Sequence, residues 1–252
     1  MSTKPVLWHI PISHYSEKAR WALKRKHVEP ELRAPQPPAH MAVALWLSRG
    51  ASITLPILDM DGRRAAGSAA IVELLDELRL GEDLVPSDPS DRAEALEIER
   101  FFDSEVGPAA RLLNWHHTTR EEDRLERYAK ATLPKPLRGS GLAVRGASGF
   151  TSFFVRSRYG VADPAAAEAA ERTLEQAFDR IEGRLDAGAG DFLVGDRFGV
   201  ADITAASLLY PLVRPEGGPR GVEVAAGVEQ VRGRMRERPA WKWVERTFAE
   251  QR

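Results

Sequence analysis

Residues 53–78 hold the densest run of local structural signals in this chain of 252 residues. The run opens with Ile-Thr-Leu-Pro-Ile-Leu, which is apolar and largely branched, as is typical of a buried strand. Pro56 cannot donate a hydrogen bond to a neighbouring strand, so it predicts a sheet edge, a bulge or a cis bond that ends the strand. Asp61-Gly62 favours a hairpin turn, and residues 63–66 are therefore expected to form the return strand.

A helix is expected directly after this hairpin. Ser68 is of a residue type that caps helix N-termini. The apolar residues that follow recur at the spacing of one helical face, namely Ile71, Leu74, Leu75 and Leu78. The order strand, proline, hairpin, strand, serine, helix resembles the second half of the thioredoxin-like domain of glutathione transferases. The resemblance implies a cis Leu55–Pro56 bond and a site for the tripeptide thiol glutathione beside it.

The preceding residues fit the first half of the same domain. Residues 5–10 are nearly all apolar and predict a strand, and residues 16–26 predict a helix with one apolar face. Residues 32–34 predict a short strand parallel to the first, because a helix joins the two. Residues 41–47 predict a short helix. Together with residues 53–78, they predict an α/β domain with a mixed sheet flanked by helices.

The turn between the first strand and its helix, residues 12–20, reads Ile-Ser-His-Tyr-Ser-Glu-Lys-Ala-Arg. It is similar to the active-site turn of serine-type transferases, the zeta and tau classes among them. In that register Ser13 matches the catalytic serine and Ser16 the second position of the motif. Spacing alone does not say which serine faces the thiol, and both fit ordinary helix caps as well. We expect Lys18 and Arg20 to make ion pairs beside the site rather than to touch the thiol.

In such a site the serine is a hydrogen-bond donor to the thiolate of glutathione and not itself the nucleophile. A free cysteine thiol has a pKa of about 8.5, so little of it is thiolate at neutral pH. A hydroxyl, backbone N–H groups and a helix N-terminus stabilise the thiolate. The chain itself has no cysteine, which excludes disulfides, thiolate metal sites and the cysteine-nucleophile branches of the family. Glutathione must therefore bring the thiol as co-substrate.

Ser68 and the residue before it have a second role in the resemblance. In the transferases the matching serine holds the γ-glutamyl carboxylate of glutathione, and Glu, Gln or Asp usually precedes it to meet the glutamyl ammonium group. This chain has Gly67 there. Three explanations stay open: another acidic residue reaches the site, the affinity is low, or the ligand is a different low-molecular-weight thiol.

The C-terminal part is expected to be an all-helical bundle. Residues 83–91 are rich in Pro, Ser and Asp and are typical of a linker, which places the two domains at residues 1–82 and 92–252. The apolar spacing predicts helices over residues 92–117, with a kink at Gly107-Pro108, and over residues 120–133 and 165–185. The two domains together make the fold that the resemblance implies.

Residues 191–204 resemble the transferase segment in which a loop enters a buried helix. Asp202 matches the acidic residue of a capping box, and Gly199 replaces the usual Ser or Thr cap. Phe198 and Ile203 match the two residues of a hydrophobic staple. These roles are structural, so Asp202 is not expected to be catalytic.

Residues 134–160 depart from the helical pattern. The segment is rich in Gly and Ser, has basic but no acidic residues, and carries Phe150, Phe153, Phe154 and Tyr159. One interpretation is a lid that gives the second-substrate pocket a basic, aromatic lining. The other is a solvated loop that aromatic residues anchor in the core.

Composition restricts the partners. The formal net charge is -1, which gives no overall field for binding nucleic acid or an anionic membrane. No apolar run is long enough to cross a bilayer, and the first residues lack the pattern of a signal peptide, so a cytoplasmic protein is expected. The histidines lack the spacing of metal ligands, and no metal is expected.

These features predict a serine-type enzyme, similar to glutathione transferases, that activates glutathione for attack on a small electrophile. The expected site residues are Ser13 and Ser16 for catalysis, and Leu55, Pro56, Gly67 and Ser68 for glutathione binding. Two alternatives stay open: a glutathione-dependent isomerase or dehalogenase, and a non-catalytic protein of the same fold that binds ligands or a regulatory partner. The resemblance also implies a homodimer.

Overall fold

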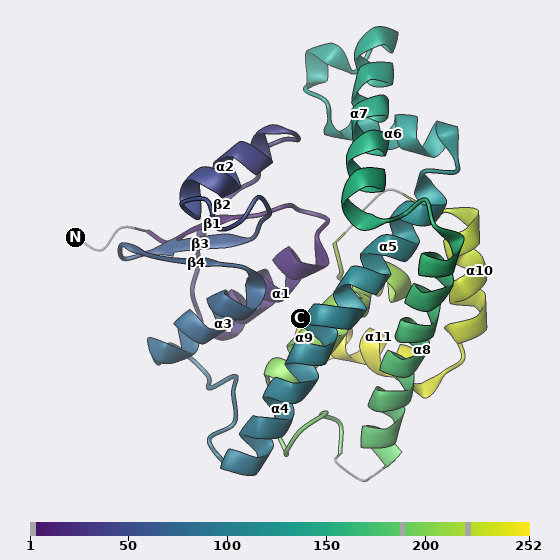
Figure 1. Cartoon of the computed structure of the whole chain (residues 1–252). Coiled ribbons are helices and arrows are strands. Elements are labelled where there is room, and N and C mark those ends of the chain that lie inside the picture. The colour runs from purple at the N-terminus through teal and green to yellow at the C-terminus, as the bar shows by residue number, and fades with distance from the viewer. Residues whose placement is uncertain (1–3, 187–189, 220–222) are drawn as a thin grey trace.

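The N-terminal part of the chain is a four-stranded mixed sheet with helices on both faces (Figure 1). The computed structural model describes residues 4–186, 190–219 and 223–252. The strand order is β2 (Glu31–Arg33), β1 (Val6–Trp8), β3 (Ile57–Met60), β4 (Arg63–Ala66). β1 is parallel to β2 and antiparallel to β3, and β3 is antiparallel to β4. The predicted mixed sheet, with its parallel second strand, is confirmed.

Three helices cover this sheet. α2 (Ala39–Leu47) lies on one face, and α1 (His14–Arg25) and α3 (Ser68–Glu77) lie on the other (Figure 1). The hairpin turn is as predicted, with positive φ at Asp61 (49°) and Gly62 (79°), the geometry that matches the twist of the flanking strands.

Two predictions in this part were wrong in detail. The peptide bond between Leu55 and Pro56 is cis, as expected, but β3 begins after the proline at Ile57 instead of ending at it. Pro56 has no N–H to give to a ladder, so the residues before it stay outside the sheet. Ser68 is the first residue of α3 rather than its cap; the cap position is held by Gly67, whose φ of 98° suits glycine.

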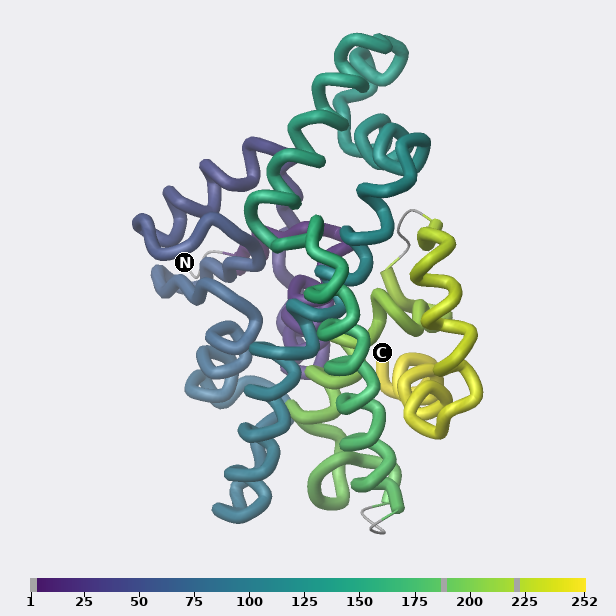
Figure 2. The backbone as a smooth tube through the Cα atoms, turned by 45° about the vertical axis from the view of Figure 1, so that its right-hand side comes forward, coloured from purple at the N-terminus to yellow at the C-terminus, as the bar shows by residue number. Residues whose placement is uncertain are grey.

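The C-terminal part is a bundle of helices, seen from two sides in Figures 1 and 2. Its helices are α4 (Pro89–Phe101), α5 (Gly107–Thr118), α6 (Glu122–Thr132), α7 (Gly141–Tyr159), α8 (Pro164–Asp186), α9 (Val200–Val213), α10 (Ala226–Met235) and α11 (Pro239–Gln251). In both figures α6 and α7 lie side by side and extend beyond the other helices. α9 is buried over nearly its whole length and packs against α1, α4, α5 and α11.

The long helix predicted over residues 92–117 is present, but it contains a π-helical stretch where a kink was expected. This stretch, η1 (Phe102–Val106), joins α4 to α5 directly before Gly107-Pro108. Pro108 lacks an N–H and its ring crowds the preceding turn, and a wider turn relieves both. Asp103 lies in this π-helical stretch, and its carboxylate accepts a hydrogen bond from Lys18 Nζ of the N-terminal part.

The prediction of a loop over residues 134–160 was wrong. A short 3-10 turn, η2 (Lys135–Leu137), leads into α7. The Ser140 hydroxyl caps α7 by accepting from Ala143 N at 3.3 Å, and Gly160 ends it with a left-handed φ of 65°. The buried residues Val144, Ser148 and Val155 recur at helical spacing, a signal that the Gly and Ser content obscured.

The two parts share one hydrophobic core. Trp21 of α1 is fully buried, with its ring centroid 5.6 Å from that of Phe198 and 4.8 Å from that of Phe248. The predicted capping box is confirmed: the Asp202 carboxylate accepts from Gly199 N at 2.9 Å and from Leu193 N at 2.8 Å. Burial raises the pKa of Asp202 to about 7. This network fixes the loop that holds Leu193 and Gly199 to the N-terminus of α9.

The division at residues 83–91 stays a prediction, and α4 begins within that segment, at Pro89. Among the described residues, no helix is both long and apolar enough to cross a membrane.

Candidate active site

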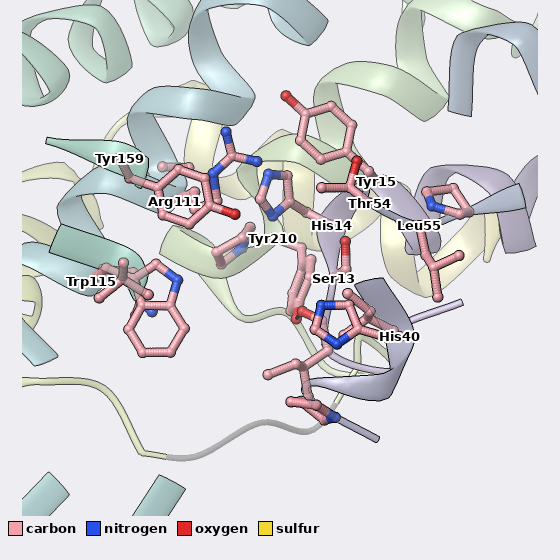
Figure 3. Close-up of a pocket in the computed structure, with 18 of the residues that line it drawn as sticks. Ser13, His14, Tyr15, His40, Thr54, Leu55, Arg111, Trp115, Tyr159 and Tyr210 are labelled. Atoms are coloured by element: carbon pink, nitrogen blue, oxygen red, sulfur yellow. Dashed lines mark hydrogen bonds between the residues drawn. The ribbon is translucent and has the colours of Figure 1, made fainter. Parts of the chain in front are cut away.

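A cavity of about 690 Å³ lies between the two parts of the chain (Figure 3). One wall comes from the N-terminal part: the start of α1, the loop before β3 and the start of α3. We call it the sheet-side wall and define it by Ser13, Leu55, Pro56, Gly67 and Ser68. The opposite wall comes from α5, α6 and α7. We call it the helix-side wall and define it by Arg111, Trp115, Tyr128, Phe150, Phe154 and Tyr159.

Ser13 is both a helix cap and a cavity residue. Its Oγ accepts from Ser16 N at 3.4 Å, which caps α1, and its side chain lines the cavity (Figure 3). Accepting that bond leaves the hydroxyl hydrogen free to donate into the cavity. Tyr210 of α9 holds the turn in place, because its hydroxyl donates to Ile12 O at 2.5 Å.

Ser16 has a different environment. It is fully buried, and its Oγ accepts from Ile10 N at 3.1 Å. Among the described residues that line the cavity, Ser13 is included and Ser16 is not. The geometry brings Ser13 together with the other expected site residues and places Ser16 behind the turn.

The residues expected to bind glutathione all line the cavity. Gly67 N donates to Pro56 O at 2.9 Å, which joins the start of α3 to the residues beside the cis bond. The backbone N–H and C=O of Leu55 make no hydrogen bond with any described residue. No described side chain caps α3, so the N–H groups at Ser68 and Ala69 are available to an anion at the positive end of the helix.

His14 is a cavity residue that sequence reasoning missed. It is 6% exposed, and its Nε2 lies 3.1 Å from Gly107 O on α5. A carbonyl only accepts, so Nε2 carries the hydrogen. Burial, and then the nearby Arg111 charge, lower the pKa of His14 to about 3, which keeps the imidazole neutral at physiological pH.

Tyr15, the next residue along α1, also lines the cavity. Its hydroxyl donates to Asp103 O at 2.7 Å, and burial raises its pKa. A Cβ at residue 107 would collide with the Tyr15 hydroxyl, so Gly107 is required for this close approach. His14 and Tyr15 therefore both fasten the start of α1 to the π-helical junction.

The helix-side wall is mainly aromatic. The rings of Trp115 and Tyr128 meet edge to face, 5.0 Å apart, and burial raises the pKa of Tyr128 to about 12. Phe150 and Phe154 stack one helical turn apart on α7. Phe153, by contrast, is 71% exposed.

One interpretation of residues 134–160 was a segment that gives the cavity a basic, aromatic lining. Its aromatic part is supported, because Phe150, Phe154 and Tyr159 of α7 line the cavity. The prediction that this segment also gives the cavity a basic lining was wrong. None of the described lining residues is a basic residue of the segment 134–160. The cationic lining comes from elsewhere, including Arg111 of α5.

Lys18 and Arg20 make ion pairs, as expected. Lys18 Nζ lies 2.8 Å from a Glu99 oxygen and 2.9 Å from an Asp103 oxygen, with its side chain fully buried. Arg20 pairs with Glu17 at 2.5 Å. Within residues 4–186, 190–219 and 223–252, no cluster of three or more potential metal ligands is present.

Comparisons with known proteins place this arrangement in one family. Residues 7–83 match the family model described as "Glutathione S-transferase, N-terminal domain", and residues 164–246 match "Glutathione S-transferase, C-terminal domain". A "Probable glutathione S-transferase" of Nicotiana tabacum is 32% identical over 99 residues, which are 39% of this chain and 43% of that protein. The match thus spans less than half the length of that relative.

Solved structures share the fold across the whole chain. A beta-etherase from Sphingobium sp. strain SYK-6 is similar with a TM-score of 0.60 and 22% identity, covering 97% of this chain and 100% of its own. A glutathione transferase from Phanerochaete chrysosporium has a TM-score of 0.62 and 16% identity, covering 100% and 98%. A Tau class enzyme from mango has a TM-score of 0.55 and 19% identity, covering 98% and 95%. With both domain models matched in order and the fold shared over its full length, this chain belongs to the glutathione S-transferase superfamily.

Proposed function

We propose that this chain is an enzyme of the glutathione transferase type that stabilises the thiolate of glutathione and directs it at a small electrophile. The observation that carries the proposal is the position of Ser13. Its hydroxyl lies at the N-terminus of α1 and faces a cavity with room for both a tripeptide and a second ligand. Hydrogen bonds to a charged acceptor and the helix dipole both favour the thiolate over the thiol there.

The sheet-side wall supports a binding mode for the peptide. The backbone of glutathione would pair with the N–H and C=O of Leu55, which have no described partner. Its γ-glutamyl carboxylate would bind at the uncapped start of α3, with the Ser68 hydroxyl as a further donor. Gly67 offers no carboxylate for the glutamyl ammonium group, so we expect the glutathione affinity to rest on these donors.

The chemistry needs only the thiolate and a bound electrophile. In a substitution, the sulfur bonds to the electrophilic carbon, and the leaving group departs with the electron pair of the broken bond. In an addition, the neighbouring carbon takes up a proton instead. The rate gain comes from a stabilised anion held next to its target.

Gly67 is the observation that favours a second candidate, a non-catalytic member of the superfamily that binds ligands or a regulatory partner. Such a protein needs no thiol, so the two candidates differ in whether glutathione binds in the cavity. A glutathione-dependent isomerase or dehalogenase would share the thiolate site and differ in whether glutathione is consumed.

The test is a calorimetric titration of glutathione into the wild type, Ser13→Ala and Ser68→Ala. We expect saturable binding that weakens about tenfold in Ser68→Ala. We also expect a thiolate absorbance band that disappears in Ser13→Ala. Ser140→Ala is the matched control, because Ser140 also caps a helix but lies outside the cavity lining. The absence of binding at millimolar glutathione would contradict the proposal and favour the second candidate.

A further inference from the structure

Arg111 of α5 has hydrogen-bond donors that no described residue accepts from. It lines the cavity, and its Nε is buried without a hydrogen-bond partner. Its guanidinium makes no hydrogen bond or ion pair with any residue that the structure describes. Arg124, which also lines the cavity, differs: its Nε bonds a Glu121 oxygen at 2.7 Å.

Aromatic rings hold the Arg111 side chain in position. Its guanidinium carbon lies 4.4 Å from the ring centroid of Tyr159 and 5.9 Å from that of Tyr15. Figure 3 shows the guanidinium close to the Tyr159 ring and the His14 imidazole. Contacts of this kind use the faces of the guanidinium, whereas its N–H donors point along its edges. The group is therefore oriented while its hydrogen-bonding capacity stays unused.

None of the nearby described titratable groups forms an ion pair with Arg111. His14 is neutral, because its pKa is lowered to about 3 by burial and by Arg111. Tyr15 and Tyr159 are phenols, and burial raises the pKa of Tyr15. Asp103 also lines the cavity, but its carboxylate pairs with Lys18 Nζ at 2.9 Å, a charge that Lys18 shares with Glu99, and forms no ion pair with Arg111. The guanidinium donors of Arg111 are thus left for a ligand in the cavity to accept.

We propose that Arg111 binds a carboxylate on the second substrate, so that the electrophile of this enzyme is an aromatic compound with an acidic group. The planar fork of arginine matches a carboxylate with two parallel hydrogen bonds. Trp115, Phe154 and Tyr128 line the same wall and supply surfaces for an aromatic ring. The proposal rests on the proposed function only in calling this ligand the electrophile.

A purely structural role for Arg111 predicts something different. The contact with Tyr159 could serve only to fasten the end of α7 to α5. In that role a long apolar side chain would serve as well, since leaving a buried donor unpaired costs free energy. The structural role therefore predicts no preference for an acid over its neutral analogue.

The test uses no glutathione, so it is independent of the thiol site. We would titrate 4-nitrobenzoate and its neutral analogue 4-nitrobenzamide into the wild type, Arg111→Met and Arg111→Lys. Tryptophan fluorescence reports the binding, because Trp115 lines the cavity. Arg145→Gln is the matched control, since it removes the same charge from an exposed position on α7.

The wild type is expected to bind the acid at least about tenfold more tightly than the amide. We expect Arg111→Met to lose this preference, Arg111→Lys to keep part of it, and Arg145→Gln to keep all of it. Equal affinities in the wild type, no saturable binding of the acid at millimolar concentration, or a preference that persists in Arg111→Met would each overturn the proposal. The wild-type comparison remains decisive if a variant fails to fold.

The result also separates this inference from the proposed function. If the acid binds through Arg111 but glutathione does not bind, the anion site is real and the transferase proposal fails. If glutathione binds and the acid shows no preference, the transferase proposal stands and the anion site fails.

Discussion

The sheet-side wall and the helix-side wall of the cavity recognise ligands in different ways. The sheet-side wall offers backbone groups at Leu55 and the start of α3, together with the Ser13 hydroxyl. Their positions are set by the fold itself. The helix-side wall offers large side chains, such as Trp115 and Phe154, that project from helix surfaces.

This difference has a consequence for specificity. A wall made of backbone suits a constant ligand, because no substitution removes an N–H except proline. A wall made of side chains can change its ligand by single substitutions that leave the helices intact. We therefore expect mutations to separate the affinity for thiol from the choice of electrophile.

The largest expected effect concerns His14. Its hydrogen bond to Gly107 O joins the start of α1, on the side of the sheet-side wall, to α5, on the side of the helix-side wall. Its pKa of about 3 in the folded chain lies below the unfolded value of 6.5. Its contribution to stability is therefore complete above pH 6.5 and is lost as the pH falls toward 3. Between pH 6.5 and pH 5 the wild type should lose about 2 kcal/mol of unfolding free energy through this group.

Urea denaturation at pH 6.5 and pH 5 measures this loss. His14→Gln keeps a donor for Gly107 O but does not titrate, so the drop should shrink by about 2 kcal/mol in this variant. His27→Gln is the control, because His27 is exposed beyond the other end of α1. If His14→Gln lost as much stability as the wild type, the two walls would not be joined through a neutral imidazole.

The next effect concerns the sheet-side wall alone. Ser13→Ala should lower kcat/KM about ten- to a hundredfold, because a hydrogen bond to a charged sulfur is lost. It should also lower stability by about 1 kcal/mol through loss of the cap. Ser140→Ala should show the same loss of stability in urea denaturation with full activity. Equal activity losses in both variants would mean that Ser13 acts only as a cap.

Local signals predicted the elements of the sheet-side wall, the resemblance to the transferases pointed to its site residues, and much of the helix-side wall was missed. The turn at Asp61-Gly62 and the strand that follows were predicted correctly, because these residues themselves determine the turn geometry. The Ser13 turn was found through its resemblance to the active-site turn of serine-type transferases, which is a short contiguous motif. α7 was missed, because its Gly and Ser content outweighed the spacing of its buried residues.

Other features could not have been found from local sequence. The neutral state of His14 depends on burial that only the folded chain provides, and on the charge of Arg111 on a distant helix. That the guanidinium donors of Arg111 have no partner among the described residues depends on which elements surround α5 in the folded chain. The surroundings of His14 and Arg111 in the folded chain produce no pattern among the residues that are adjacent to them in the sequence.

The smallest effect concerns the helix-side wall, where α7 provides its own control. Phe154 lines the cavity, whereas the adjacent Phe153 is 71% exposed. Phe154→Ala removes a ring surface worth about 1 kcal/mol, so KM for an aromatic electrophile should rise about fivefold. The dissociation constant of glutathione should not change, because the peptide site lies on the other wall.

Steady-state kinetics on Phe154→Ala and Phe153→Ala give KM for the electrophile, and a glutathione titration of both variants gives the dissociation constant. Phe153→Ala should behave as the wild type in each. A change in glutathione affinity in Phe154→Ala would show that the two walls do not act separately, because the tripeptide would then extend onto α7. An unchanged KM would mean instead that the electrophile binds nearer to α5, beside Arg111 and Trp115, where the acidic group is expected to bind.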